Sequence, residues 1–339
     1  MMIPPLKEMQ DKYFNFYECC LLTKGAKRSI VVDSQRNFFY FIPNDLFDLI
    51  MTYQGVRIKE ILNSFEADDQ KVVIEYFKFL YEKELIFLTN ENLPFKPINM
   101  NLDFPHKLAN AVIDFRDRLN FDLLSALELL QNLDTPDIQF RIYKNGHYFL
   151  SAIVEALKDL TFEHVDIMMN FENDKSYDEV CLLLKKHPNI TSISIYNYSA
   201  KRRPNNPKMV HFAEQLTGAE MCGVVGTRYF NTNLYHYLES IKHNTCLNGK
   251  IAIDENGLVK QCPSMKQDYG VYSYDNLMKA LKDKRYQKYA TISKDQILVC
   301  KDCEFRNICS DCRAIITDED NIYSKPLKCN YDPYTTQWH

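Results

Sequence analysis

The sequence predicts an α/β protein with three parts, and three observations lead to this prediction. Between residues 105 and 240, strand-like runs alternate with helical runs, which is typical of right-handed βαβ units and a parallel sheet. Residues 1–92 instead place short strands ahead of helices. The final hundred residues hold most of the 11 cysteines of this 339-residue chain. We therefore expect domains at 1–92, 105–240 and 241–339.

The first part predicts a small α+β domain of winged-helix type. Its strand candidates are rich in β-branched and aromatic residues and are separated by turn residues: Tyr17–Thr23, Ser29–Asp33, Asn37–Ile42 and Leu85–Leu88. Helices are expected near Leu46, over Ile58–Ser64 and around the apolar repeat of Val72–Tyr81. Cys19 and Cys20 fall inside the first predicted strand, where neighbouring side chains point to opposite faces. We therefore expect them to be structural and unable to share one metal.

The middle part predicts a degenerate partial barrel of parallel strands and helices. The expected strands are Asp137–Tyr143, His164–Asn170, Ile190–Tyr198 and Met221–Tyr229. The expected helices are Phe115–Asn132, His147–Asp159, Tyr177–His187 and Leu234–Lys242.

The last part carries thiols at metal-ligand spacing. The dense run is Cys300-x2-Cys303-x5-Cys309-x2-Cys312, with Cys246 and Cys262 before it and Cys329 after it. Thiolates grouped in this way bind zinc or iron–sulfur clusters. Disulfides need an oxidising compartment, and residues 1–5 do not begin a secretory signal pattern, so we expect a cytoplasmic, metal-binding protein.

This cysteine pattern resembles the SPASM domain, the auxiliary iron–sulfur module of many radical SAM peptide-modifying enzymes. The resemblance covers residues 246–329 and includes Gly257, five places before Cys262. It departs from the family in one place, because two residues separate Cys309 from Cys312 where the family usually has three. The tail D-C-R-A-I…K-C-N-Y-D-P-Y-T-T-Q-W further resembles the SPASM protein of grasp-with-spasm systems, in which a ribosomally made peptide (a RiPP) is matured beside an ATP-grasp ligase.

The resemblance implies two 4Fe-4S clusters with interleaved ligands. The first would be held by Cys300, Cys303, Cys309 and Cys329. The second would be held by Cys246, Cys262 and Cys312, with a fourth ligand from Cys222 or His243 or with an open iron. Spacing alone does not reject two zinc ions as the alternative cofactors.

Beside a SPASM domain, the N-terminal part resembles the PqqD-like module that binds precursor leaders. In that family the leader adds a strand to the edge of a small sheet and lies against the third helix, a recognition mode in which backbone hydrogen bonds supply affinity. The candidate peptide-binding residues are Phe38, Tyr40, Tyr76 and Lys83. The alternative role for these side chains is core packing.

The chain lacks the C-x3-C-x2-C motif that holds the catalytic cluster in the radical SAM family. We therefore expect no catalytic residue and no radical initiation, and an accessory role in which the protein binds the precursor leader and works with the ligase. The alternatives are a zinc-binding scaffold of the same system and a true radical SAM enzyme. The net charge of −4 and the absence of a long apolar run predict no nucleic-acid or membrane partner.

Overall fold

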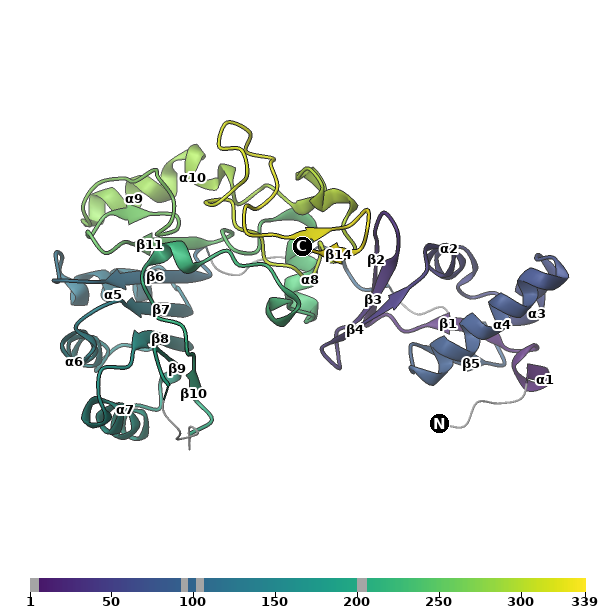
Figure 1. The fold of residues 1–339 in the computed structure, drawn as a ribbon, viewed down its shortest axis with the longest axis horizontal. Helices are drawn as coiled ribbons and strands as arrows, with labels where there is room; N and C mark the ends of the chain where they lie inside the picture. The colour runs from purple at the N-terminus through teal and green to yellow at the C-terminus, as the bar shows by residue number, and fades with distance from the viewer. Residues whose placement is uncertain (1–5, 93–96, 102–106, 200–205) are drawn as a thin grey trace.

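The computed structural model describes residues 6–92, 97–101, 107–199 and 206–339, and it is a mixed α/β protein. The N-terminal part and the central sheet lie at opposite ends of the molecule, with the cysteine-rich C-terminal region between them (Figure 1). Among the described residues, no helix combines the length and the apolar character that crossing a membrane requires.

The N-terminal part contains the expected strands followed by helices. Its strands are β1 Tyr13–Phe16, β2 Cys20–Lys24, β3 Ser29–Asp33, β4 Phe38–Ile42 and β5 Ile86–Thr89. Its helices are α1 Leu6–Met9, α2 Asn44–Tyr53, α3 Ile58–Asn63 and α4 Ala67–Glu82. Strands β2, β3 and β4 form an antiparallel sheet in that order, and β1 pairs with β5. The apolar faces of the helices enclose one core around Phe14, Ile50 and Phe77.

One difference from the sequence prediction lies in the first strand. The strand predicted over Tyr17–Thr23 begins only at Cys20, where β2 starts, because residues 17–19 form a turn after β1, which ends at Phe16. The backbone N–H of Cys20 donates to the Tyr17 carbonyl and closes this turn. Cys19 therefore stands outside the strand, and the alternation of strand side chains does not apply to it.

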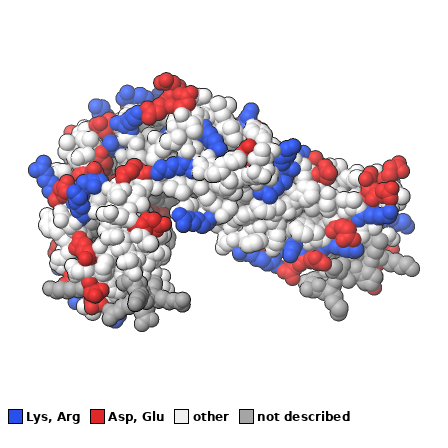
Figure 2. Space-filling model, viewed as in Figure 1, with Lys and Arg blue, Asp and Glu red and all other residues white. Residues whose placement is uncertain are grey.

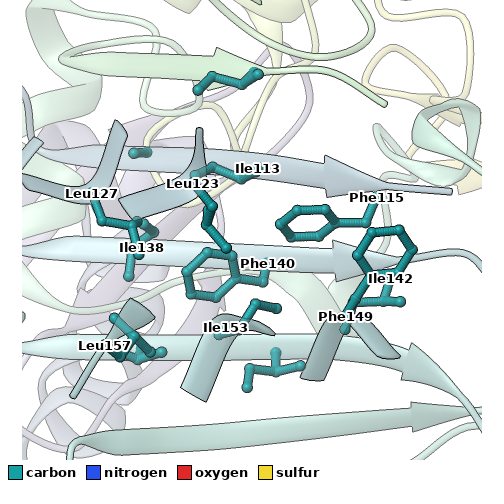
Figure 3. Close-up of a cluster of buried hydrophobic side chains, with 14 of the residues drawn as sticks. Ile113, Phe115, Leu123, Leu127, Ile138, Phe140, Ile142, Phe149, Ile153 and Leu157 are labelled. Atoms are coloured by element: carbon teal, nitrogen blue, oxygen red, sulfur yellow. The ribbon is translucent and has the colours of Figure 1, made fainter. Parts of the chain in front are cut away.

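The central part is a seven-stranded sheet in the order β10-β9-β8-β7-β6-β11-β12, parallel except for β12. Its strands are β6 Asn110–Phe115, β7 Asp137–Ile142, β8 His164–Asn170, β9 Ile190–Tyr196, β10 Met209–His211, β11 Lys250–Ile253 and β12 Val259–Lys260. Helices connect successive strands: α5 Leu123–Asn132, α6 Gly146–Ala156 and α7 Asp174–Lys186. Figure 3 shows these helices packing Leu123, Phe149 and Ile153 against Phe115 and Phe140 of the sheet.

Two central predictions are wrong. The helix expected over Phe115–Asn132 is instead the end of strand β6, a loop and helix α5, which Asp122 caps by accepting from the Ser125 N–H at 3.1 Å. The strand expected over Met221–Tyr229 is replaced by two short 3-10 turns, η1 Ala219–Met221 and η2 Thr227–Tyr229. Gly223, between these turns, has φ +83°, a left-handed conformation that interrupts an extended run.

The C-terminal region is mostly irregular. Its elements are α8 Leu234–Lys242, α9 Tyr274–Lys282, α10 Lys284–Lys288, η3 Lys294–Gln296, η4 Cys300–Asp302, β13 Tyr331–Asp332 and β14 Gln337–Trp338. Strand β11 follows α8 but lies in the central sheet beside β6. Residues beyond 240 complete the central sheet, so the sheet does not end at the predicted boundary. The domain boundary at residue 240 stays a prediction.

The N-terminal sheet packs directly on this C-terminal region. Leu21, Ile30 and Val32 of β2 and β3 share a buried cluster with Phe305 and Ile308. The contact is also polar: Arg28 Nε lies 2.7 Å from the buried Glu304 carboxylate, and the Ala26 N–H donates to the Asp302 carbonyl at 2.8 Å. The first ninety residues are therefore seated on the cysteine-rich region.

Candidate metal centres

Four of the predicted ligand cysteines line one small cavity of about 30 Å³ in the C-terminal region. They are Cys300, Cys303, Cys309 and Cys329. Turn η4 brings the first two together, since the Cys303 N–H donates to the Cys300 carbonyl at 3.0 Å. The third follows a turn in which the Cys309 N–H donates to the Phe305 carbonyl at 3.0 Å. This is the set that the resemblance to the SPASM domain implies for the first cluster.

The walls of this cavity are largely apolar. Phe230, Phe305, Tyr331 and Trp338 line it, and their rings contact one another. Burial raises the pKa of Cys309 to about 12 and raises the pKa of Cys300 and Cys303 well above the ordinary thiol value. A thiolate in this cavity loses its hydrating water, and the apolar walls do not replace that water. It therefore needs a positively charged neighbour.

Lys294 supplies a positive charge beside this cavity. Its side chain lines the cavity, the residue is only 3% exposed, and Nζ is a buried atom without a hydrogen-bond partner among the described residues. Turn η3 fixes its position, with Ser293 and Gln296 capping each other. A buried ammonium without a hydrogen bond is costly, and the charges that act with it include the Glu239 carboxylate and the cavity thiols. The donor set and this cation together fit a negatively charged group such as four thiolates around an iron–sulfur cluster.

The remaining three predicted ligands also come together, at the edge of the central sheet. Lys250 begins β11, and its Nζ lies 3.7 Å from Cys246 Sγ. Burial acts to lower the pKa of Lys250, but the negative charges of Cys246, Cys262 and Cys222 outweigh it and raise that pKa. Cys312 joins this group, because the charge of Cys246 also acts on its thiol, whose pKa burial raises.

The structure favours Cys222 over His243 as a neighbour of this second group. A Cβ placed on Gly223 would lie 2.9 Å from Cys312 Cβ and 3.1 Å from its Sγ, so the backbone beside Cys222 touches Cys312. Burial lowers the pKa of His243, and the Ala290 backbone and Lys242 also act on it.

The separations of the sulfurs bear on the choice of metal. A tetrahedral zinc ion with Zn–S bonds of about 2.3 Å holds its sulfurs about 3.8 Å apart. Among the described residues, three or more ligand atoms lie within 4.8 Å of one another only at Cys19, Cys20 and Asp33, so no three of the seven predicted sulfurs meet that limit. In this structure these sulfurs therefore do not stand at the separations that one tetrahedral zinc ion imposes.

A buried polar network adjoins the second group. Arg141 of β7 makes a bidentate ion pair with Asp114 of β6, at 2.7 and 2.8 Å, and the Tyr143 hydroxyl donates to the same carboxylate at 2.7 Å. The third arm of Arg141, Nη1, lies 2.9 Å from Cys222 Sγ. The sequence analysis predicted the strand that carries Arg141 but assigned no role to this residue.

The structure corrects the prediction for Cys19 and Cys20. Their sulfurs and a carboxylate oxygen of Asp33 all lie within 4.8 Å of one another, so the two residues do face one point. The reason is the turn that ends at Cys19, which frees its side chain from the alternation of the strand. Cys20 and Asp33 are direct partners in the β2–β3 register and so share a face.

Three of the predicted peptide-binding residues share one surface. Phe38 is 55% exposed and its ring centroid lies 5.0 Å from that of Tyr40, while Lys83 Nζ lies 5.9 Å from the Tyr40 centroid. Tyr40 also contacts Phe79 of α4 at 6.3 Å. Tyr76 is partly buried against the N-terminal core, and burial raises its pKa, with Asp45 of α2 the next contributor. None of the contacts above joins Tyr76 to the other three.

The visible face of the molecule carries acidic and basic side chains side by side (Figure 2). This distribution agrees with the net charge of −4 and gives that face no continuous basic field of the kind nucleic acid attracts.

Comparison with known proteins gives little guidance. No protein-family model and no curated protein sequence matches the chain. One solved structure to which it is similar is SuiB of Streptococcus suis bound to S-adenosylmethionine. The two are 12% identical, the comparison covers 92% of this chain and 98% of SuiB, and the TM-score is 0.31. We draw neither fold nor function from a similarity at this level.

Proposed function

We propose that this chain is an accessory maturation protein for a ribosomally made peptide and carries two auxiliary 4Fe-4S clusters. The observation that carries the proposal is the cavity lined by Cys300, Cys303, Cys309 and Cys329, with the buried cation Lys294 beside it. A full set of four thiolates is the usual ligand set of such a cluster.

The second cluster is assigned to Cys246, Cys262 and Cys312, with Cys222 as the fourth ligand. The contact of Gly223 with Cys312 and the shared influence of Cys246, Cys262 and Cys222 on Lys250 support this set. Arg141 then positions the Cys222 sulfur through its 2.9 Å contact. Each cluster would serve as a redox-active or a structural centre. If one of its protein ligands exchanged, the cluster would instead offer a binding point.

Iron and acid-labile sulfide in the anaerobically purified chain test this proposal. We expect about eight of each per chain, since two four-iron clusters are proposed. Cys303→Ser and Cys262→Ser are each expected to lose about half of the iron, and Cys181→Ser serves as the control, because Cys181 lies on α7, outside both groups. A colourless protein that contains two zinc ions and no iron would support the zinc scaffold instead.

The N-terminal part is proposed to bind the precursor leader along β4. This strand pairs with β3 on one side, and no further strand pairs with it among the described residues. Phe38 and Tyr40 stand beside α4, close to Lys83, and offer an aromatic and cationic surface to an added strand. An acidic or amphipathic leader would fit that surface.

A binding assay with the leader of the precursor encoded beside the gene tests this part. We expect Phe38→Ala and Lys83→Met to weaken binding by about tenfold each, the effect of losing a residue at the centre of an interface. Met51→Ala, at an exposed position of α2 in the same domain, is the control. Equal affinity of all four proteins would remove β4 as the binding surface.

The ATP-grasp ligase remains the proposed partner for the chemistry. The chain has no C-x3-C-x2-C and no G-x-x-x-x-G-K-[ST] motif, so neither the adenosyl radical nor the ATP-dependent step is assigned to it. A true radical SAM enzyme would require the missing thiolates, and cleavage of S-adenosylmethionine by the reduced, purified chain would establish that alternative.

A further inference from the structure

We propose that Cys19, Cys20 and Asp33 form a separate site for one soft divalent ion of the zinc class. These residues lie in the N-terminal part, outside the cysteine pattern that suggested the clusters. Their three ligand atoms lie within 4.8 Å of one another, close to the separations that a tetrahedral zinc ion imposes. Two sulfurs and one oxygen form a three-ligand set with one coordination position left open.

The backbone holds the three side chains in place. Cys20 and Asp33 face each other across the β2–β3 ladder. Both the N–H and the hydroxyl of Ser34 donate to the Cys19 carbonyl, at 3.1 and 2.8 Å, and fix the turn that carries Cys19. A metal ion would therefore find its ligands nearly in position, with only a small closure needed.

Asp33 is supported as metal-binding carboxylates usually are. Its side chain is 1% exposed, and Oδ1 accepts the backbone N–H groups of Gln35 and Arg36. Oδ2 accepts from Arg36 Nη1 at 2.7 Å. A carboxylate has about four acceptor positions, so one remains for a metal ion. Hydrogen-bonded partners of this kind orient ligands and strengthen metal binding.

The charges favour a divalent ion. Two thiolates and one carboxylate carry three negative charges, and Arg36, which lies 2.7 Å from Asp33 and also pairs with Glu84, does not neutralise them alone. Binding converts two thiols to thiolates and releases two protons to water, with no change of oxidation state. Zinc, cobalt(II) and cadmium suit such a donor set better than magnesium or calcium, which prefer oxygen.

The site also has an entrance. Cys19 lines a cavity of about 680 Å³, together with Tyr17, Arg36, Tyr81 and Glu84. An ion and its fourth ligand can reach the site from this side, while Cys20 and Asp33 are buried behind it. The bound ion would tie the turn before β2 to the end of β3, and Arg36, which also contacts Glu84, extends that link to the end of α4.

Metal analysis of the full chain tests this site independently of the clusters. The chain, Cys19→Ser and Cys181→Ser are purified anaerobically, loaded with iron and sulfide, equilibrated with zinc and desalted. We expect equal iron in all three and one zinc more in the wild-type chain and Cys181→Ser than in Cys19→Ser. Cobalt(II) titration should give a thiolate charge-transfer band in the difference spectrum between the wild-type chain and Cys19→Ser, with affinity in the variant lower by more than about 100-fold.

Several outcomes would overturn the site. Equal zinc in the wild-type chain and Cys19→Ser is one, and a Cys19–Cys20 disulfide in the anaerobic protein is another. If Cys19→Ser has an altered melting profile, Cys20→Ala, an apolar replacement at a buried position, is measured in the same way and must also lack the extra zinc. Failure of iron to load in every protein would count against the proposed clusters, yet the zinc difference would still decide this site.

Discussion

The prediction that examines the first cluster most directly concerns Lys294. Its ammonium is buried beside Cys300 and Cys309 and has no hydrogen-bond partner among the described residues. Replacing it with methionine keeps the length of the side chain and removes the charge. The substitution should stabilise the iron-free protein but weaken iron binding in the loaded protein. These two measurements together test the position of Lys294.

Without iron, Lys294→Met should stabilise the chain. A buried charge without a partner costs several kcal/mol, and replacement of buried ionic groups by apolar ones typically gains about 1–4 kcal/mol. In a protein larger than about 150 residues each kcal/mol shifts the melting temperature by about 2–4 °C or less, so a rise of a few degrees is expected. Differential scanning calorimetry of the iron-free protein measures it.

With iron bound, the same change should weaken the cluster. Loss of an outer partner of a metal site costs about 10–100-fold in affinity, which corresponds to about 1.4–2.7 kcal/mol. We expect faster loss of iron to a chelator by about this factor, followed by absorbance. Lys301→Met is the matched control, since Lys301 is the exposed lysine next to Cys300 in turn η4. If Lys294→Met keeps its iron as long as the wild-type chain does, Lys294 does not face a cluster and the reasoning fails.

Three further predictions follow from the structure. Cys222→Ser should lose the iron of one cluster by metal analysis, whereas His243→Gln should keep it; the reverse would exchange their roles. Burial raises the pKa of Glu239 to about 7 from the usual 4.5, so the folded protein loses stability as the pH rises from 4.5 through 7. Glu239→Gln should therefore gain about 2–3 kcal/mol at pH 8 and nothing near pH 4 in denaturant titrations, and an equal gain at both pH values would contradict this. Phe41→Ala, which removes a contact with the C-terminal region 5.7 Å from Phe305, should lower the melting temperature, while Phe38→Ala should not.

The elements best predicted from the sequence are those with strong periodicity. The strand His164–Asn170 and the helix Leu234–Lys242 agree with the structure to the residue, because their apolar residues repeat at the period of the element. Such patterns indicate one face packed on a core, which is the central core for the strand and the cluster around Phe305 for the helix.

The failures have physical causes that lie far from the mispredicted residues in the sequence. Strand β6 ends in A-V-I-D-F, and its buried Asp114 is satisfied by Arg141, which is 27 residues away. The residues near Phe115 do not indicate this distant partner. The sequence analysis therefore predicted that a helix begins there. In residues 221–229 the composition favours a strand, but the left-handed Gly223 places the backbone against Cys312 instead. Both errors arise from contacts that join distant parts of the chain.

The candidate sites also differ in how far the sequence predicts them. The spacing of the C-terminal cysteines predicted metal binding, because short chelate loops let two sulfurs reach one centre, and the family resemblance implied the two ligand sets. Four of these cysteines line one cavity, while their binding of a metal stays a prediction. Lys294 and the site at Cys19 could not be found from spacing. The first is a single lysine in an irregular segment, and the second depends on a turn that shifts Cys19 out of the strand by one position.

Strand β4 links the two halves of the proposed function. Its side chains alternate, so Phe38 and Tyr40 stand toward α4 whereas Phe39 and Phe41 contact Phe305, at 5.8 and 5.7 Å. Phe305 in turn lines the cavity of the first four cysteines. A peptide strand added to β4 would thus be one strand away from the wall of that cavity. Leader binding and cluster retention should therefore depend on each other, since ligands that share a packed element are coupled through it in both directions.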